Sequence, residues 1–188
     1  MTSPTAAPKL LDHLERFLGR ICDIESGETS EGHRGYDLVE YHLEDRGVAS
    51  VITNGLRFQD ITTLQPQELV CTLYEDQRHI ARYFTDAMAR LTLKHQRGLE
   101  YGFHFDNRRP LVEGTEICGL LAHPSPLFGE EFDLVWNEAG AIAMQIITLI
   151  PLTDPEIEFV EAEGPERMWE VFQLHRVDVL DVKRESAV

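Results

Sequence analysis

The chain has 188 residues, of which 43% are hydrophobic and 27% are charged. This composition supplies an ordinary hydrophobic core and excludes a disordered chain, and the length is that of one domain. Lysine and arginine number 17 against 33 aspartates and glutamates, which gives a net charge of −16. This charge excludes nucleic acid and anionic membranes as natural partners and favours a basic one, although it is equally compatible with a role in solubility alone.

The three cysteines, Cys22, Cys71 and Cys118, are far apart in the sequence. Their odd number and the lack of a CxxC pair argue against a disulfide framework and predict a reducing compartment. Each lies in an apolar stretch, which is typical of a small buried residue. The N-terminus lacks the pattern of a secretory signal, and the longest apolar run, 139–152, is shorter than the about 20 residues that span a bilayer. We therefore expect a soluble, cytoplasmic protein.

Near the N-terminus, apolar residues recur at steps of three and four, which predicts an amphipathic helix over residues 8–22. Pro8 suits the first turn of such a helix. The next segment, 23–35, is polar and rich in glycine, so we expect a loop there. The apolar positions of the helix are Leu10, Leu11, Leu14, Phe17, Leu18 and Ile21.

Two segments with alternating polar and apolar residues, 36–44 and 48–53, predict a pair of strands. The Asp-Arg-Gly sequence between them is a turn signal, so we expect an antiparallel hairpin. Gly55 follows the second strand, and glycine accepts the positive φ that a turn at this point requires. Residues 68–74 predict a third strand.

A long amphipathic helix is predicted over residues 76–97, because its apolar residues have nearly ideal helical spacing. Asp76 is the expected N-cap, and Gly98 is the expected left-handed residue at the C-terminal end. Arg78 and Arg82 fall on the opposite face, which we expect to meet solvent or acidic loops.

In the second half of the chain, strands are predicted over residues 115–122, 132–136 and 141–152. The last of these is nearly all apolar, which indicates a central strand buried on both faces. Thr153 and Glu156 then form an S/T-x-x-E capping box, which begins a helix.

Gly164 and Pro165 end that helix, and residues 165–173 predict a second, short one. The alternating segment 177–182 predicts a final strand. Together these elements predict an α+β fold with a mixed, mostly antiparallel sheet flanked by helices.

The segment most like an active site is 101–106, Tyr-Gly-Phe-His-Phe-Asp. His104 and Asp106 could act as a base and its orienting group, but no Gly-x-Ser-x-Gly elbow supplies a nucleophile. The other interpretation is an aromatic strand that packs on a helix. The eight histidines include no HExxH motif, and their spacing does not suit a metal site. The sequence therefore predicts no enzyme, no metal and no other cofactor.

An acidic cluster occupies the helix that follows the capping box. Carboxylates three and four residues apart share a helix face, where like charges are slightly destabilising. Such a face is either solvated or meets a basic surface of a partner. The candidate partner-binding residues are Asp154, Glu156, Glu158, Glu161 and Glu163.

Three blocks of the chain follow one another in an order and spacing found in a known family. The first is the strand end and glycine turn of 51–56 with the Glu-Leu strand of 68–73. The second is the buried strand 144–153, which ends in a proline and a helix cap. The third is 179–184, with its aspartate and arginine. Together they resemble the suppressor-of-fused domain family over residues 35–186.

The resemblance implies an α+β sandwich without a catalytic centre. It predicts one domain over residues 1–188, in which a helix and polar loop (1–34) precede the family-like core (35–186). Eukaryotic members sequester a transcription factor, partly by adding a peptide strand to a sheet. Bacterial single-domain members resemble immunity proteins, which neutralise a cognate toxin of a polymorphic toxin system.

The expected function is therefore a non-enzymatic, acidic immunity protein that binds a basic toxin domain. Two alternatives remain at this point. One is an enzyme with a site at 101–106, and the other is a scaffold or small-ligand-binding domain.

Overall fold

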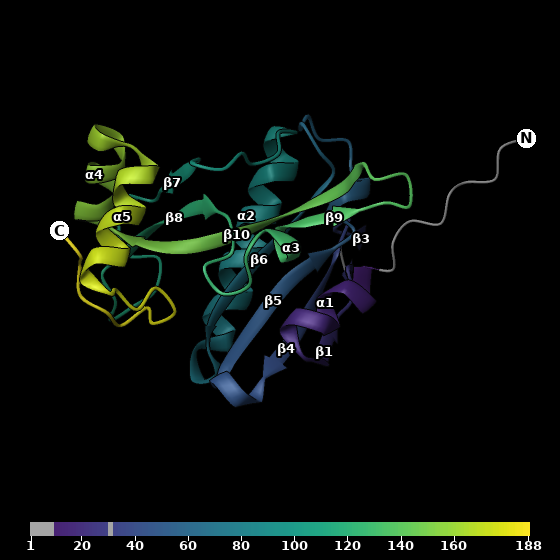
Figure 1. The fold of residues 1–188 in the computed structure, drawn as a ribbon, viewed down its shortest axis with the longest axis horizontal. Coiled ribbons are helices and arrows are strands. Elements are labelled where there is room, and N and C mark those ends of the chain that lie inside the picture. The colour runs from purple at the N-terminus through teal and green to yellow at the C-terminus, as the bar shows by residue number, and fades with distance from the viewer. Residues whose placement is uncertain (1–9, 30–31) are drawn as a thin grey trace, which may run out of the picture.

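A mixed β-sheet forms the centre of the molecule, and helices cover both of its faces (Figure 1). The structure, a computed structural model, describes residues 10–29 and 32–188. Within these residues eight strands form one sheet, in the order β1-β4-β5-β6-β10-β8-β7, with β9 pairing to β10. Its strands are β1 (Arg20–Glu25), β4 (Asp37–Leu43), β5 (Val48–Asn54), β6 (Gln67–Tyr74), β7 (His104–Asp106), β8 (Ile117–His123), β9 (Leu134–Trp136) and β10 (Ile142–Thr153).

Five α-helices are present in the described residues, and a separate two-stranded ribbon follows β1. All neighbouring strands of the main sheet are antiparallel except β6 and β10, which run parallel. This agrees with the predicted mixed, mostly antiparallel sheet. The remaining elements are α1 (Leu10–Leu18), α2 (Arg78–His95), α3 (Glu130–Asp133), α4 (Asp154–Glu163), α5 (Pro165–His175), β2 (Glu28–Thr29) and β3 (Gly32–His33).

The long strand β10 divides the core into two sides, because successive side chains of a strand point to opposite faces. Ile147 and Leu149 pack in the cluster that contains α2. Ile146 packs on the other face in a cluster with α1, and Ile150 packs there with α4 and α5. The prediction of a central strand over 141–152 is confirmed.

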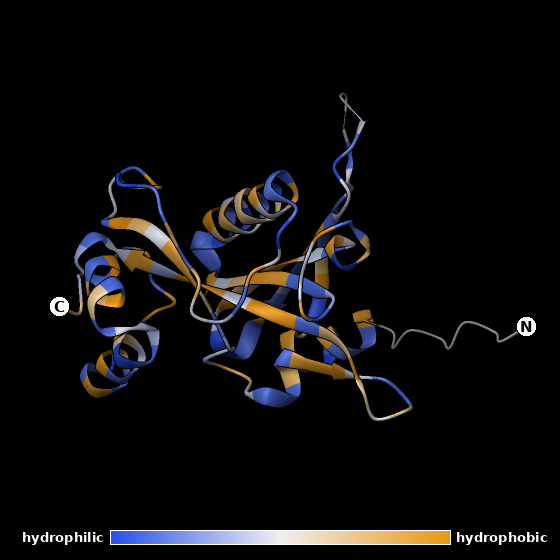
Figure 2. Ribbon diagram, turned by 90° about the horizontal axis from the view of Figure 1, so that it is seen from above, coloured by the Kyte–Doolittle hydropathy of each residue, from blue (hydrophilic) through white to orange (hydrophobic). Residues whose placement is uncertain are grey.

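The hydropathy of the elements matches these layers. In Figure 2 the central strands are largely hydrophobic, while the helices alternate between hydrophobic and hydrophilic residues. Such alternation is expected of helices that bury one side on a sheet. In the described part of the chain, no helix combines the length and the apolar character that crossing a membrane requires.

The predicted N-terminal helix is shorter than its apolar pattern indicates. Its expected first residue, Pro8, lies outside the described residues, and α1 ends at Leu18. Gly19 follows with a φ of 84°, and a side chain there would meet the His42 carbonyl oxygen at 2.5 Å. Because the chain comes this close to β4 at Gly19, it pairs with β4 from Arg20 onward, and Ile21 and Cys22 therefore belong to a strand. Cys22 is consequently exposed, whereas the other two cysteines are buried as predicted.

The polar segment 23–35, predicted as a loop, contains the end of β1 and the ribbon β2–β3. The ends of α2 also differ from prediction. A 3-10 turn at Glu75–Gln77 precedes α2, so Asp76 is not its N-cap. Gln96, with a φ of 49°, is the left-handed residue at its end. Gly98 serves instead to let its backbone approach the Thr63 side chain.

The predicted hairpin, third strand and capping box are all confirmed. The predicted final strand is wrong, because residues 177–182 form turns. This segment lies beside the end of β6, where the Tyr74 N–H donates to the Leu180 carbonyl oxygen at 3.2 Å. Its other anchor is a side chain, since Gln77 donates to Asp181 and accepts from the Val182 N–H. These bonds to the Gln77 side chain hold the segment in place, whereas a strand would be held by a series of backbone hydrogen bonds.

Candidate protein-binding surface

The exposed side of α4 carries four of the five predicted partner-binding residues. Asp154, Glu158, Glu161 and Glu163 are all exposed. Glu161 lies 3.6 Å from the His104 Nε2 atom. Within the described residues, the other three carboxylates form no ion pair with any lysine or arginine. Asp154, Glu158 and Glu161 are four and three residues apart and therefore share one side of the helix, whereas Glu163 is exposed at its C-terminal end. These four exposed carboxylates are called the acidic face of α4 below.

Glu156 is the exception, because it points into the protein and is fully buried. Its carboxylate accepts hydrogen bonds from the Arg184 guanidinium at 2.6 and 2.7 Å. It also accepts from the N–H groups of Thr153 and Ala187, each at 2.9 Å. A buried, fully bonded carboxylate cannot meet a partner, so including Glu156 in a binding face was incorrect. The capping-box spacing indicated only its bond to the Thr153 backbone.

Some surface carboxylates elsewhere are paired with arginines. The clearest case is Arg82 of α2, which contacts Asp23 at 2.7 Å and both Glu25 and Glu40 at 2.8 Å. Hydrogen bonding from Arg82 lowers the pKa of Asp23 below its ordinary value. Arg82 is therefore a charge partner for acidic residues rather than part of a freely solvated face. The acidic face of α4 has no such arginine.

The edge strand β7 lies next to this acidic face. It pairs only with β8 among the described strands, so its other side is an open sheet edge. His104 points toward α4, where it meets Glu161, while Phe105 packs on the opposite side in the cluster that contains α2. Burial raises the pKa of Cys118, and the carboxylates of Asp154 and Asp106 raise it further.

The geometry does not join His104 and Asp106 as a base and its orienting group. His104 faces Glu161, whereas the Asp106 Oδ1 atom accepts a hydrogen bond from the Arg108 N–H. The segment instead behaves as an aromatic strand packed on a helix, which was the other interpretation. Across the described residues, no group of three or more His, Cys, Asp or Glu side chains is placed to hold a metal ion.

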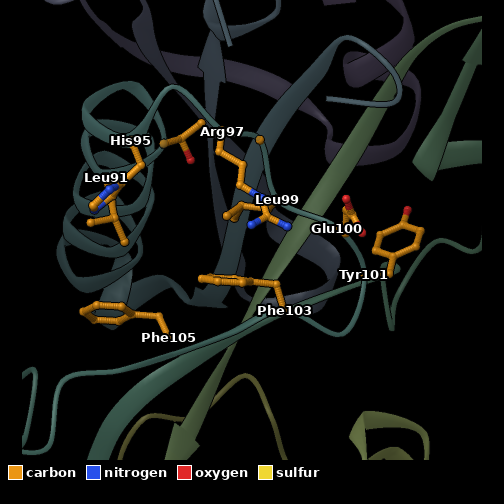
Figure 3. Close-up of a pocket in the computed structure, with 10 residues that line it drawn as sticks. Leu91, His95, Arg97, Leu99, Glu100, Tyr101, Phe103 and Phe105 are labelled. Carbon is orange, nitrogen blue, oxygen red and sulfur yellow. The ribbon is translucent and has the colours of Figure 1, made fainter. Parts of the chain in front are cut away.

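On the α2 side of β7 lies a cavity of about 660 Å³ (Figure 3). Its walls come from the last turns of α2 and from the chain between 97 and 105. No motif in the sequence indicated this cavity. The only signal was the alternation of three aromatic residues, Tyr101, Phe103 and Phe105, all of which line it.

Tyr101 also closes a break in the sheet. β9 and β8 pair with successive parts of β10 and leave a gap between Gln145 and Thr148. The Tyr101 hydroxyl donates to the Ile146 carbonyl oxygen at 3.3 Å. Burial raises the pKa of Tyr101 to about 12. Its role here is to satisfy a backbone carbonyl where no strand is present.

Comparisons with known proteins agree on one family. The family model described as Suppressor of fused protein (SUFU) matches residues 32–185. No curated protein matches the chain.

Three solved structures share the fold. A candidate suppressor of fused homologue from Neisseria gonorrhoeae FA 1090 has 18% identity and a TM-score of 0.73, over 97% of this chain and 96% of that one. A chain of the Sufu–Fu complex has 13% identity and a TM-score of 0.67, over 99% and 93%. Drosophila Suppressor of Fused has 15% identity and a TM-score of 0.57, over 80% of this chain and 42% of that one. With the family model matching most of its length, the chain belongs to the suppressor of fused family.

Proposed function

We propose that this chain is a non-enzymatic protein-binding domain that acts as a bacterial immunity protein. It would neutralise a cognate toxin in the cytoplasm by binding a basic surface of the toxin directly. Family membership supports a binding role, since one similar structure is that of the Sufu–Fu complex. The bacterial relative has nearly the same length as this chain, which fits the single-domain type.

The observation that carries the proposal is the acidic face of α4. Asp154, Glu158, Glu161 and Glu163 are exposed on a helix of ten residues. Like charges three and four residues apart, as in Glu158/Glu161 and Asp154/Glu158, cost the helix a few tenths of a kcal/mol per pair. That cost is offset if the face attracts a basic partner, because complementary charge raises the rate of association.

The open edge of β7 gives the same partner a place to attach. An unpaired edge offers main-chain N–H and C=O groups to an extended peptide. Because His104 meets Glu161, this edge and the acidic face form one continuous surface. A partner segment lying there would meet carboxylates on the α4 side of the strand and aromatic rings on the other.

The test begins by capturing partners of the tagged protein from its own cells and purifying the most abundant one. Association kinetics are then measured across a range of salt concentrations. The test variant is D154N/E158Q/E161Q/E163Q. We expect its association rate to fall at least about tenfold at low salt and the difference to shrink as salt screens the charges.

A matched control removes four exposed, unpaired carboxylates that lie away from α4. This variant, D45N/D60N/E113Q/E138Q, has the same net charge as the test variant. If both variants slow association equally, overall charge is responsible and the α4 face is not the binding surface. If the captured partner is not a toxin, or its toxicity persists in the complex, the immunity role is wrong.

A further inference from the structure

The cavity beside α2 has the size and walls of a small-molecule site. Its volume of about 660 Å³ lies within the range of about 300–1,000 Å³ that is typical of ligand pockets. The walls are mainly hydrophobic, with Leu91, Leu99, Phe103 and Phe105 contributing. Phe103 keeps 42% of its surface exposed although it lines this hollow. An exposed ring in a concave apolar site is what a bound apolar group would cover.

Arg97 supplies a positive charge at this cavity (Figure 3). Its side chain extends from the segment after α2 toward the middle of the cavity. Most other arginines in the described residues lie within 4 Å of a carboxylate, whereas Arg97 has no ion pair. In a chain with 33 acidic residues, Arg97 is thus one of the minority of arginines that keep their charge available. A planar guanidinium is the protein group best suited to bind a carboxylate.

The backbone holds Arg97 in place without using its side chain. The Arg97 N–H donates to the Thr92 carbonyl oxygen at 3.2 Å. On either side, Thr62 bonds to Gln96 and Gly98, each at 2.9 Å. These bonds fix the backbone of Arg97 at the cavity, while its guanidinium stays available to a ligand.

We propose that this cavity binds a small amphipathic carboxylate. The apolar body of the ligand would lie against Leu99, Phe103 and Phe105, and its carboxylate would pair with the Arg97 guanidinium. Glu100 also lines the cavity, and repulsion from its charge directs the carboxylate toward Arg97. This site goes beyond the proposed function, because it requires no protein partner.

Three probes with the same ten-carbon tail distinguish this proposal from non-specific hydrophobic binding. Decanoate, decanol and decylammonium are titrated into the full chain by calorimetry, below their micelle concentrations. The net charge of −16 by itself favours the cation. We expect decanoate to bind most tightly, against this general preference. Tighter binding of decylammonium, or equal binding of all three, would overturn the proposal.

Two variants then locate the binding. Arg97→Gln should weaken decanoate at least about tenfold, the loss of one charged hydrogen-bonding partner, and leave decanol unchanged. The control is Arg176→Gln, at a second recess of about 370 Å³, and it should leave decanoate binding intact. An unchanged affinity in Arg97→Gln, or an equal loss in Arg176→Gln, contradicts the assignment.

A third variant tests the apolar wall. Phe103→Ala should weaken decanoate and decanol alike, because both tails would use the ring. Thermal melting of each variant checks that folding is retained, which is expected since Arg97 is exposed. A Phe103→Ala protein that folds and binds both probes normally would remove this cavity as the site. None of these results depends on whether a toxin is the partner.

Discussion

Glu156 and Arg184 show how a residue of a predicted surface cluster is buried inside the fold. Their side chains are 0% and 6% exposed, and they form a bidentate ion pair. The capping box at Thr153 was predictable from the sequence, but the arginine was not, because it lies 28 residues further along. A pattern of local spacing cannot reveal a partner that only the tertiary fold supplies.

Removing one member of this pair should be far worse than removing both. Glu156→Leu leaves a buried guanidinium without its carboxylate, and we expect a cost of about 3–5 kcal/mol in the free energy of unfolding. The double variant E156L/R184M leaves no buried charge and should cost clearly less than the sum of its two single changes. Urea denaturation of the four proteins measures this coupling, and strictly additive costs would contradict it.

Asp133 makes the stability of the fold depend on pH, in the direction opposite to that of a carboxylate paired with an arginine. Burial raises its pKa from 3.8 to about 6 in the folded protein. Between these values the folded state keeps a proton that the unfolded chain has released. The contribution of Asp133 to stability is therefore largest below about pH 4 and declines as the pH rises to about 6.

Asp133→Asn should remove this decline and still accept the hydrogen bond from the Ser125 N–H. The variant is expected to gain on the order of 1–3 kcal/mol relative to the parent above pH 6, and nothing below pH 4. Urea denaturation at a series of pH values gives the difference between the two proteins. A difference that does not change with pH would show that Asp133 keeps an ordinary pKa.

At the scale of elements, the periodicity of apolar residues predicted most strands and helices. It did not predict the residues at which one element ends and the next begins. The hairpin β4–β5 and the strand β10 have clear patterns, and both were found where expected. β1 was missed because Ile21 continues the helical spacing of α1 beyond Gly19. Only the contact of Gly19 with the His42 backbone breaks the helix, and that contact comes from another strand.

Gly119 of β8 controls the position of β7 on one side and α4 on the other. A side chain there would overlap the Phe105 carbonyl oxygen and would lie 2.7 Å from the Ile157 Cδ1 atom. We expect Gly119→Ala to cost about 2–4 kcal/mol and to speed amide exchange in β8 and β7.

Gly140→Ala is the comparison, because nothing lies within 4 Å of a side chain at that turn. Its φ of 73° should limit the cost to about 1 kcal/mol. Denaturation and hydrogen exchange of both variants test whether close packing or backbone conformation dominates. Equal costs would show that the close approach at Gly119 is readily relieved.

At the scale of the whole molecule, the sequence indicated the family and the fold class but not the topology. The parallel pairing of β6 with β10 joins segments that no local pattern connects. The cavity beside α2 depends on the same long-range arrangement, as does the segment 177–182 that lies against Gln77. The acidic residues of α4 could be predicted to lie together because they belong to one helix, but the burial of Glu156 could not.

The C-terminal segment should be essential to cooperative folding. Ending the chain after Arg176 removes Val179 and Val182, which are buried, together with Arg184. We expect this truncation to abolish a cooperative thermal transition, whereas removing only Val188, which is exposed, should lower stability only slightly. Circular dichroism and calorimetry distinguish the two, and a cooperative melt of the shorter chain near the parent's midpoint would contradict this role.

The bonds that join the C-terminal segment to the end of β6 also bear on the speed of folding. Tyr74 and Gln77 contact residues that lie 104 and 105 positions further along the chain. Such contacts form only after a long loop has closed, and the chain loses the entropy of that closure before any of these bonds can form. Chains dominated by non-local contacts fold in milliseconds to seconds, on the order of a thousand times more slowly than small helical bundles. A newly made chain should therefore spend this interval with its C-terminal segment undocked, and any binding that needs the complete fold would be delayed until that segment is in place.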